Sequence, residues 1–233
     1  MNAVEREQLK LAAARAAVEA VESGMILGLG SGSTAEQAIR VIGERLANGT
    51  LKNVRGVPTS RQSAALAKIH NVPLVSLDDV RAIDLDVDGA DEIDPELRLI
   101  KGGGGALLYE KIVAQASERV IIIADDSKLS PKLGTKYFVP VETVSIARAP
   151  VERFLQTLGA EAALRRRSDG SLFLTDEGNV LLDATFGEID DPERLASELK
   201  AKSGVVEHGL FLEEADVAIV ADVSGARELT RGG

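Results

Sequence analysis

The feature that most constrains the fold is a repeated order of short apolar segment, polar loop and amphipathic segment in the part of the chain before about Lys136. Val120–Ala124 is almost entirely β-branched, as expected of a strand that is covered on both faces. The other segments that predict strands are Met25–Leu29, Asn53–Pro58, Val72–Ser76 and Ala82–Val87. Helices are predicted over residues 4–23, Ala35–Leu46 and the segment that ends at Ile69. Strands that alternate with helices indicate an α/β fold with a doubly wound, mostly parallel sheet.

The pattern changes after about Lys136. Strands are predicted over Phe138–Ile146, Ala160–Arg167, Leu172–Leu174 and Val180–Thr185, and helices over Val151–Leu158 and from Asp191-Pro192 onward. With Val205–Val206 as the last strand, this order is close to the β-α-β-β-α-β order of small α+β, ferredoxin-like domains. We therefore predict a Rossmann-like domain over residues 1–136 and 209–233, and an inserted α+β domain over residues 137–208. Val217–Ala221 would be the last strand of the first domain, and Arg227–Gly233 a loose tail.

Composition excludes several classes of protein. The net charge of −10 argues against nucleic acid as the main partner, because binding to the phosphate backbone needs a basic face. The absence of cysteine excludes disulfides and zinc sites built on thiolates. No apolar run reaches the roughly 18 residues of a membrane span, and the charged segment Met1–Lys10 does not resemble a secretory signal. A cytoplasmic protein is expected.

The stretch from Asp88 to Glu110 concentrates the residues that suggest chemistry. Lys101 precedes the glycines Gly102–Gly105, and Asp88-Gly89-Ala90-Asp91-Glu92 lies just upstream. Consecutive glycines indicate a turn that a ligand approaches closely, with backbone N–H groups that can bind an anion. The apolar spacing after Ala106 predicts a helix with Glu110 about one turn from its start.

A second loop, Gly30-Ser31-Gly32-Ser33-Thr34, joins a predicted strand to a predicted helix. Backbone donors and hydroxyls at a helix N-terminus suit a phosphate group. The loop lacks the lysine of a Walker motif, and it matches only the looser form of the dinucleotide fingerprint. This loop, Pro58–Ser60, Asp88–Glu92 and Asp125–Lys128 all follow predicted strands. Ligands of doubly wound sheets bind beyond the carboxyl ends of the strands, so these loops define a candidate site.

Together these segments resemble ribose-5-phosphate isomerase of the A type over nearly the whole chain. The resemblance is carried by Gly28–Ala35, Val57–Ser60, Asp86–Ile93, Ile100–Leu107, Glu110–Ile112, Ile123–Lys128 and Gly204–Phe211. It implies interconversion of ribose 5-phosphate and ribulose 5-phosphate in the pentose phosphate pathway, without a metal or other cofactor. It also implies a homodimer or homotetramer, and neither nucleic acid nor a membrane is an expected partner.

The resemblance also assigns roles to residues of this chain. Glu110 aligns with the catalytic base, with Asp88 and Lys101 as further catalytic residues. The implied substrate-binding residues are Lys10, Ser31, Gly32, Ser33, Thr34, Asp88, Gly89, Ala90, Asp91, Lys101, Gly102, Gly103, Gly104 and Lys128. One carboxylate can move the proton between C2 and C1, and partial burial would strengthen it as a base. Lys101 and the glycine N–H groups would stabilise the enediolate oxygens.

Other interpretations are weaker but remain open at this point. Asp88, Asp91 and Glu92 could hold Mg²⁺, although Lys101 would compete for the same place. A sugar-phosphate sensor would need a DNA-binding module, and residues 1–24 contain no basic helix-turn-helix. An acyl-CoA transferase would need room to bind coenzyme A, and this chain is short for that. A nicotinamide-dependent dehydrogenase would need an acidic residue about 20 positions past the glycine loop, and none is found. His70 and His208 are expected to be structural or exposed.

Overall fold

The computed structural model describes residues 3–232, and their contacts divide the chain into two compact units. Unit 1 contains the segment up to Ala90, Tyr109–Lys128 and the segment from Glu213 onward. Unit 2 contains Asp91–Leu108 and Leu129–Leu212. The predicted inserted domain of residues 137–208 lies within unit 2. That residues 137–208 form a domain with these boundaries stays a prediction.

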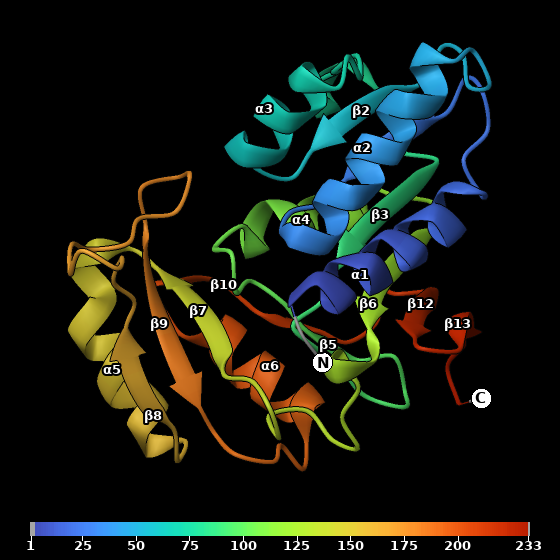
Figure 1. The fold of residues 1–233 in the computed structure, drawn as a ribbon. Helices are drawn as coiled ribbons and strands as arrows, with labels where there is room; N and C mark the ends of the chain where they lie inside the picture. The colour runs from blue at the N-terminus through green and yellow to red at the C-terminus, as the bar shows by residue number, and fades with distance from the viewer. Residues whose placement is uncertain (1–2, 233) are drawn as a thin grey trace. The chain divides into compact units, whose positions relative to one another are not determined.

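Unit 1 is built on a six-stranded sheet in the order β13-β12-β6-β3-β1-β2 (Figure 1). Its strands are β1 (Ile26–Leu29), β2 (Arg55–Pro58), β3 (Leu85–Gly89), β6 (Val120–Asp125), β12 (Val217–Asp222) and β13 (Gly225–Leu229). All neighbours are parallel except β12 and β13, which form a hairpin. Every residue of β6 is buried, as its β-branched sequence predicts.

Helices cover both faces of this sheet. α1 (Ala3–Val18), α2 (Ser33–Ala47) and α3 (Arg61–Ile69) contribute apolar residues to one core, against alternate residues such as Ile121 and Ile123 of β6. On the other face, Val113 of α4 (Leu107–Gln115) packs with Val57 and Ile83. A short 3₁₀ turn, η1 (Leu77–Asp79), adds Leu77 to that side. The predicted doubly wound, mostly parallel sheet is confirmed.

Unit 2 contains a four-stranded antiparallel sheet in the order β10-β7-β9-β8. Its elements follow the chain as β7 (Val139–Thr143), η3 (Ser145–Ala147), α5 (Arg148–Thr157), β8 (Glu161–Leu164), β9 (Val180–Thr185), α6 (Pro192–Ala201) and β10 (Val205–His208). This is the predicted β-α-β-β-α-β order. Val151 and Leu155 of α5 and Leu195 and Leu199 of α6 pack on one face of the sheet. A separate three-stranded sheet joins β4 (Glu92–Ile93), β5 (Leu99–Ile100) and β11 (Leu210–Phe211).

Several predicted elements were wrong in detail. Leu172–Leu174 is not a strand, because it forms only isolated bridges, between Leu172 and Arg166 and between Leu174 and Val180. α1 ends at Val18 and does not continue to residue 23. Val72–Ser76 is not a strand: only Leu74 pairs, with Gly56, because Pro73 has no N–H to extend the ladder. The predicted loose tail contains most of β13, whose exposed residues carry no apolar signal. No helix among residues 3–232 is long and apolar enough to cross a membrane.

Candidate active site

The carboxyl ends of four parallel strands of unit 1 lie at one edge of its sheet. β6, β3, β1 and β2 are neighbours in that order. They place the loops at Asp125–Lys128, Asp88, Gly30–Thr34 and Pro58–Ser60 along this edge, as the sequence predicts. β3 is flanked on both sides, so Asp88 lies at the middle of the edge.

Asp88 is held in one orientation by backbone donors. Its side chain is buried, and Oδ1 accepts hydrogen bonds from the N–H of Ser31 at 3.0 Å and of Gly89 at 2.7 Å. A Cβ atom on Gly30 would lie 2.2 Å from the same oxygen. Gly30 is therefore needed for the carboxylate to fit beneath the loop.

A cation lies at the N-terminus of α2. Lys10 Nζ donates to Ser33 Oγ at 2.9 Å and to Glu7 Oε1 at 2.6 Å. Gly32 is the N-cap residue of α2 and brings no side chain to cap the first N–H groups. The ammonium group and the helix N-terminus both attract negative charge, so this end of α2 suits a phosphate.

Hydroxyl groups tie the loops after β1 and β2 to each other. Ser31 Oγ lies 2.8 Å from Thr59 Oγ1 and donates to Ser60 Oγ at 2.7 Å. Ser60 also caps α3 by accepting from the N–H of Ser63 at 3.0 Å. Thr34 lies beside Gly89, with its Cβ 3.9 Å from where a Cβ on that glycine would stand. The Ser31 loop is thus fixed from two neighbouring strands.

Glu110 occupies the first turn of α4 and is only 4% exposed. The sequence predicts its place in the helix, and the structure shows that its side chain is buried. Lys128 ends a 3₁₀ turn, η2 (Asp126–Lys128), that follows β6, and it is partly buried. Asp125, just before this turn, is buried and accepts from the N–H of Ser127 at 3.0 Å.

In unit 2, Asp91 is bonded to the glycine loop. Its Oδ2 accepts from the N–H of Gly103 at 2.7 Å. Gly104 is exposed, and its N–H donates to no acceptor among residues 3–232. The hydroxyl of Tyr137 lies against Gly103, 2.5 Å from where a Cβ on that glycine would stand. Burial, and then the charge of Asp91, raises the pKa of Tyr137 to about 12, so this hydroxyl stays protonated.

Lys101 is a buried cation. It is 3% exposed, its N–H donates to Gly209 O at 2.9 Å, and its Nζ lies 5.4 Å from the ring centroid of Phe211. An ammonium group over an aromatic face is stabilised by the ring quadrupole. Sequence reasoning did not assign a role to Phe211, although it belongs to the segment Gly204–Phe211 that carries the resemblance.

Glu92, one of the three acids of the Mg²⁺ interpretation, has a structural role. It is fully buried, and its two carboxylate oxygens accept from the N–H groups of Gly134 and Lys136, both at 2.9 Å. Among residues 3–232 no group of three or more histidine, aspartate or glutamate side chains is arranged to hold a metal ion. His208 is buried and His70 partly buried.

Sequence reasoning also missed Arg165 and Tyr137, which contact or approach the glycine loop in unit 2. Arg165 Nη1 donates to the carbonyl oxygens of Gly102 and Gly103, each at 2.9 Å. Strand alternation could have placed Arg165 on the face opposite to Ala162 and Leu164, which pack in the core. It could not have shown what lies on that face.

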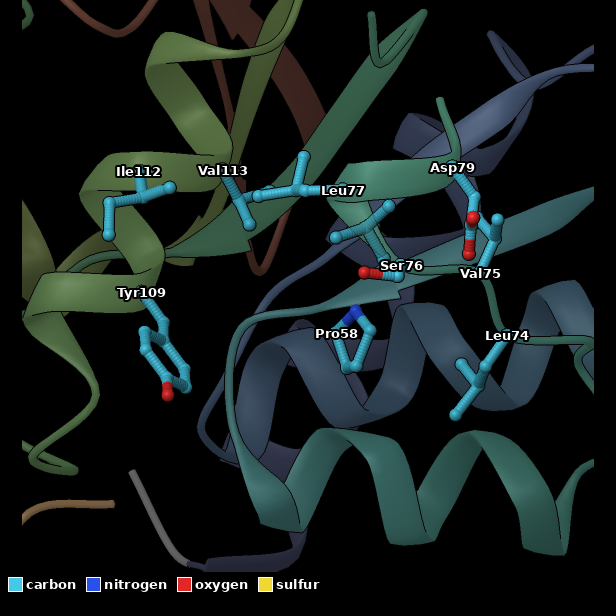
Figure 2. A pocket seen from close by; sticks show the side chains of 10 residues that line it. Pro58, Leu74, Val75, Ser76, Leu77, Asp79, Tyr109, Ile112 and Val113 are labelled. Atoms are coloured by element: carbon cyan, nitrogen blue, oxygen red, sulfur yellow. The ribbon is translucent and has the colours of Figure 1, made fainter. Parts of the chain in front are cut away.

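A separate cavity of about 630 Å³ lies in unit 1 and is lined by none of the predicted catalytic or substrate-binding residues, although Pro58 belongs to one of the predicted loops. Figure 2 shows Tyr109, Ile112 and Val113 extending from α4 on one side of it, with Pro58 and Ser76 on the other. It is mostly apolar and lacks the cations that a sugar phosphate needs. Among its lining residues, Tyr109 is the direct neighbour of Glu110 in the sequence.

The comparisons with known proteins agree with one another. Residues 55–225 match the family described as ribose 5-phosphate isomerase A (phosphoriboisomerase A). The ribose-5-phosphate isomerase A of Chloroflexus aurantiacus is 51% identical over 99% of this chain and 96% of its own. That of Sinorhizobium fredii is 50% identical over 98% of this chain and 100% of its own.

Solved structures give the same result. A D-ribose-5-phosphate isomerase in complex with phospho-erythronic acid has a TM-score of 0.95 at 41% identity, covering 99% of this chain and 100% of that chain. Ribose 5-phosphate isomerase A of Methanocaldococcus jannaschii has a TM-score of 0.92 at 41% identity, over 96% of this chain and 99% of that chain. Sequence and fold together show that the chain belongs to the ribose 5-phosphate isomerase A family.

Proposed function

We propose that Glu110, Asp88 and Lys101 are the catalytic residues of this ribose-5-phosphate isomerase. The activity itself follows from membership of the family: the chain interconverts ribose 5-phosphate and ribulose 5-phosphate, an aldose and a ketose. What we propose is which residues carry out the reaction and which role each of them has in it.

One observation supports the proposal most strongly, the burial of three ionisable groups in the motifs of the family. Glu110 is 4% exposed, Asp88 1% and Lys101 3%. Such side chains are almost never buried without a partner or a function, because loss of hydration is costly for a charge. The two carboxylates and one ammonium group supply what an aldose–ketose isomerisation requires.

The proton moves from C2 to C1 through an enediolate, so a single base on one side of the sugar can take it and return it. We assign this role to Glu110. As the proton leaves C2, negative charge develops on the carbonyl oxygen at C1. Lys101 and the N–H of Gly104 are suited to stabilise that charge, because both are donors that are already in place.

Asp88 has one carboxylate oxygen engaged by two backbone N–H groups. We assign it a role on the sugar hydroxyls, either opening of the furanose ring or movement of a proton between O1 and O2. Asp91, fixed to Gly103, is assigned to the same part of the substrate. Assigning Asp88 and Asp91 to the same part of the substrate is supported by their spacing in the sequence, where only Gly89 and Ala90 separate them.

The phosphate is assigned to Lys10, Ser31–Thr34 and Lys128. Lys10 and Ser33 are bonded to each other at the N-terminus of α2, where backbone donors and an ammonium group come together. The structure similar to this chain that holds phospho-erythronic acid supports a site for a phosphorylated sugar acid in this family. A cytoplasmic location is proposed from the composition, and a homodimer or homotetramer and a reaction without a metal or other cofactor are proposed from the resemblance.

The test is Glu110→Gln, which keeps the size of the side chain but cannot accept the proton. General bases contribute about 10²- to 10⁴-fold, so kcat is expected to fall by at least about a hundredfold. Affinity for phospho-erythronic acid is expected to stay within about tenfold of the wild-type value. Glu118→Gln, at an exposed position after α4, is the matched control. Near-normal turnover of Glu110→Gln would remove Glu110 as the base.

A further inference from the structure

The face of the four-stranded sheet opposite to α5 and α6 carries a partly buried arginine that is hydrogen-bonded to the glycine loop. Arg165 follows β8, and its side chain is 10% exposed. Nη1 donates to the carbonyl oxygens of Gly102 and Gly103, both at 2.9 Å. Nε donates to Asp183 Oδ2 at 2.9 Å, and Nη2 donates to Asp183 Oδ1. One guanidinium group thus joins β9 to the loop.

These two hydrogen bonds fix the direction of the donors that follow in the chain. Each carbonyl belongs to the same planar peptide as the next N–H, and in a trans peptide the two point in opposite directions. With the oxygens of Gly102 and Gly103 turned toward Arg165, the N–H groups of Gly103 and Gly104 turn away from it. The first reaches Asp91, and the second has no acceptor among residues 3–232.

Aromatic rings complete the surface on which the loop rests. The guanidinium carbon of Arg165 lies 5.4 Å from the ring centroid of Phe138 and 5.7 Å from that of Phe173. A Cβ atom on Gly105 would lie 2.5 Å from the Phe173 ring. The loop is therefore in direct contact with the sheet face, and small displacements of Arg165 or Phe173 would move it.

We infer that Arg165 is a positioning residue of the isomerase, which orients the Gly104 N–H and the Gly103–Asp91 bond toward the reacting end of the sugar. This inference rests on the proposed function, in which those groups meet the substrate. Arginine suits the role because its planar fork binds the Asp183 carboxylate and two carbonyl oxygens at once. A lysine is a single point charge and cannot hold the same three partners in a plane.

The opposing explanation is that Arg165 only stabilises unit 2. An arginine of that kind would affect stability on removal, but it would leave the kcat of the folded enzyme unchanged. The two explanations predict different kcat values for the folded variant that lacks Arg165, and different responses of that kcat to added guanidinium.

The experiment compares Arg165→Ala, Arg165→Lys and Arg148→Met, all as full-length enzyme. Arg148→Met removes an arginine that pairs with Glu152 on α5, away from the loop, and is expected to retain wild-type kcat. For Arg165→Ala, kcat is expected to fall about ten- to hundredfold, since a displacement of about 1 Å in a catalytic group can cost that much. KM is expected to stay within about threefold, because the phosphate contacts are elsewhere. Arg165→Lys is expected to recover only part of kcat.

Millimolar guanidinium is expected to restore kcat of Arg165→Ala in a saturable way, with sodium chloride and urea at equal concentration as controls. Wild-type kcat in folded Arg165→Ala, or a kcat loss that guanidinium does not restore, would overturn the inference. If Arg165→Ala does not fold, the same comparison is made with Arg165→Lys and Asp183→Asn, and wild-type kcat in both would overturn it. If Glu110→Gln retains activity, the proposed function fails instead, and that result does not depend on Arg165.

Discussion

The four glycines of the loop are not equivalent residues. A Cβ atom would lie 2.8 Å from Leu107 at Gly102, 2.5 Å from the Tyr137 hydroxyl at Gly103, and 2.5 Å from Phe173 at Gly105. At Gly104 nothing lies within 4 Å, and its φ is not positive. The sequence predicted that close approach of a ligand, and not packing, explains these glycines. In the structure, packing explains three of them, and Gly104 alone has open space.

This difference predicts opposite outcomes for two substitutions. Gly104→Ala should leave the free energy of unfolding unchanged or raise it by up to about 1 kcal/mol, since alanine restricts the unfolded chain. Its kcat/KM should fall about tenfold or more, because the methyl group stands beside the donor proposed to meet the enediolate. Gly105→Ala should lose about 1–3 kcal/mol of stability, because its φ of 86° strains alanine and the Phe173 ring blocks the methyl group.

Urea denaturation and steady-state kinetics on the two variants decide the matter. Full activity of Gly104→Ala would show that the open side of this glycine does not face the substrate. An unchanged midpoint for Gly105→Ala would show that Phe173 can move aside.

At the scale of elements, the sequence predicted those helices and strands that apolar periodicity and turn residues mark locally. The parallel strands of unit 1 and the β-α-β-β-α-β order of unit 2 were found, because buried strands and capped helices such as Asp191-Pro192 leave local signals. β13 was missed because its residues are exposed and it is held by pairing with β12. Arg165 was missed for a related reason: its partners are more than 60 residues away in the chain, at Gly102 and Gly103.

β7 carries a buried carboxylate whose titration should be visible in stability. Burial raises the pKa of Glu142, against the lowering effect of hydrogen bonds from Asn179 and Thr175, and Glu207 lies opposite it on β10. The folded protein therefore holds this proton to higher pH than the unfolded chain does. Its contribution to stability is present at low pH and is lost as the pH rises through the raised pKa.

Glu142→Gln removes that titration, and the amide oxygen can accept the same two hydrogen bonds. The variant should be more stable than the wild type at about pH 8, and the difference should shrink toward about pH 4. Urea unfolding at several pH values measures it, with exposed Glu161→Gln on β8 as the control. A difference that is constant with pH would mean that Glu142 does not titrate differently in the two states.

At the scale of the whole molecule, the proposed site residues divide between the two units. Lys10, Ser31–Thr34, Asp88, Glu110 and Lys128 belong to unit 1, whereas Asp91, Lys101 and the glycine loop belong to unit 2. The chain passes from one unit to the other at Ala90–Asp91, within the motif Asp86–Ile93, and again at Leu108–Tyr109, between the motifs Ile100–Leu107 and Glu110–Ile112. The proposed phosphate-binding residues all lie in unit 1, and the proposed donors to the enediolate all lie in unit 2.

The last prediction follows from this division. The phosphate does not react, so its contacts should hold the substrate in both the ground state and the transition state. Lys128→Ala should therefore mainly raise KM and weaken competitive inhibition by inorganic phosphate. Lys101→Ala should mainly lower kcat, because Lys101 meets charge that appears only in the transition state. A charge-assisted hydrogen bond contributes about 1.5–3 kcal/mol, so each effect should be roughly ten- to hundredfold.

Steady-state kinetics on both variants, with exposed Lys68→Ala on α3 as the control, separates the two roles. Inhibition by inorganic phosphate is the more direct readout, because that ion can report only on the phosphate contacts. It should weaken in Lys128→Ala and stay unchanged in Lys101→Ala. The reverse result, with kcat lost in Lys128→Ala and phosphate inhibition lost in Lys101→Ala, would assign the phosphate to the buried cation of unit 2. The isomerase activity would stand in that case, but Lys101 could no longer be the group that stabilises the enediolate.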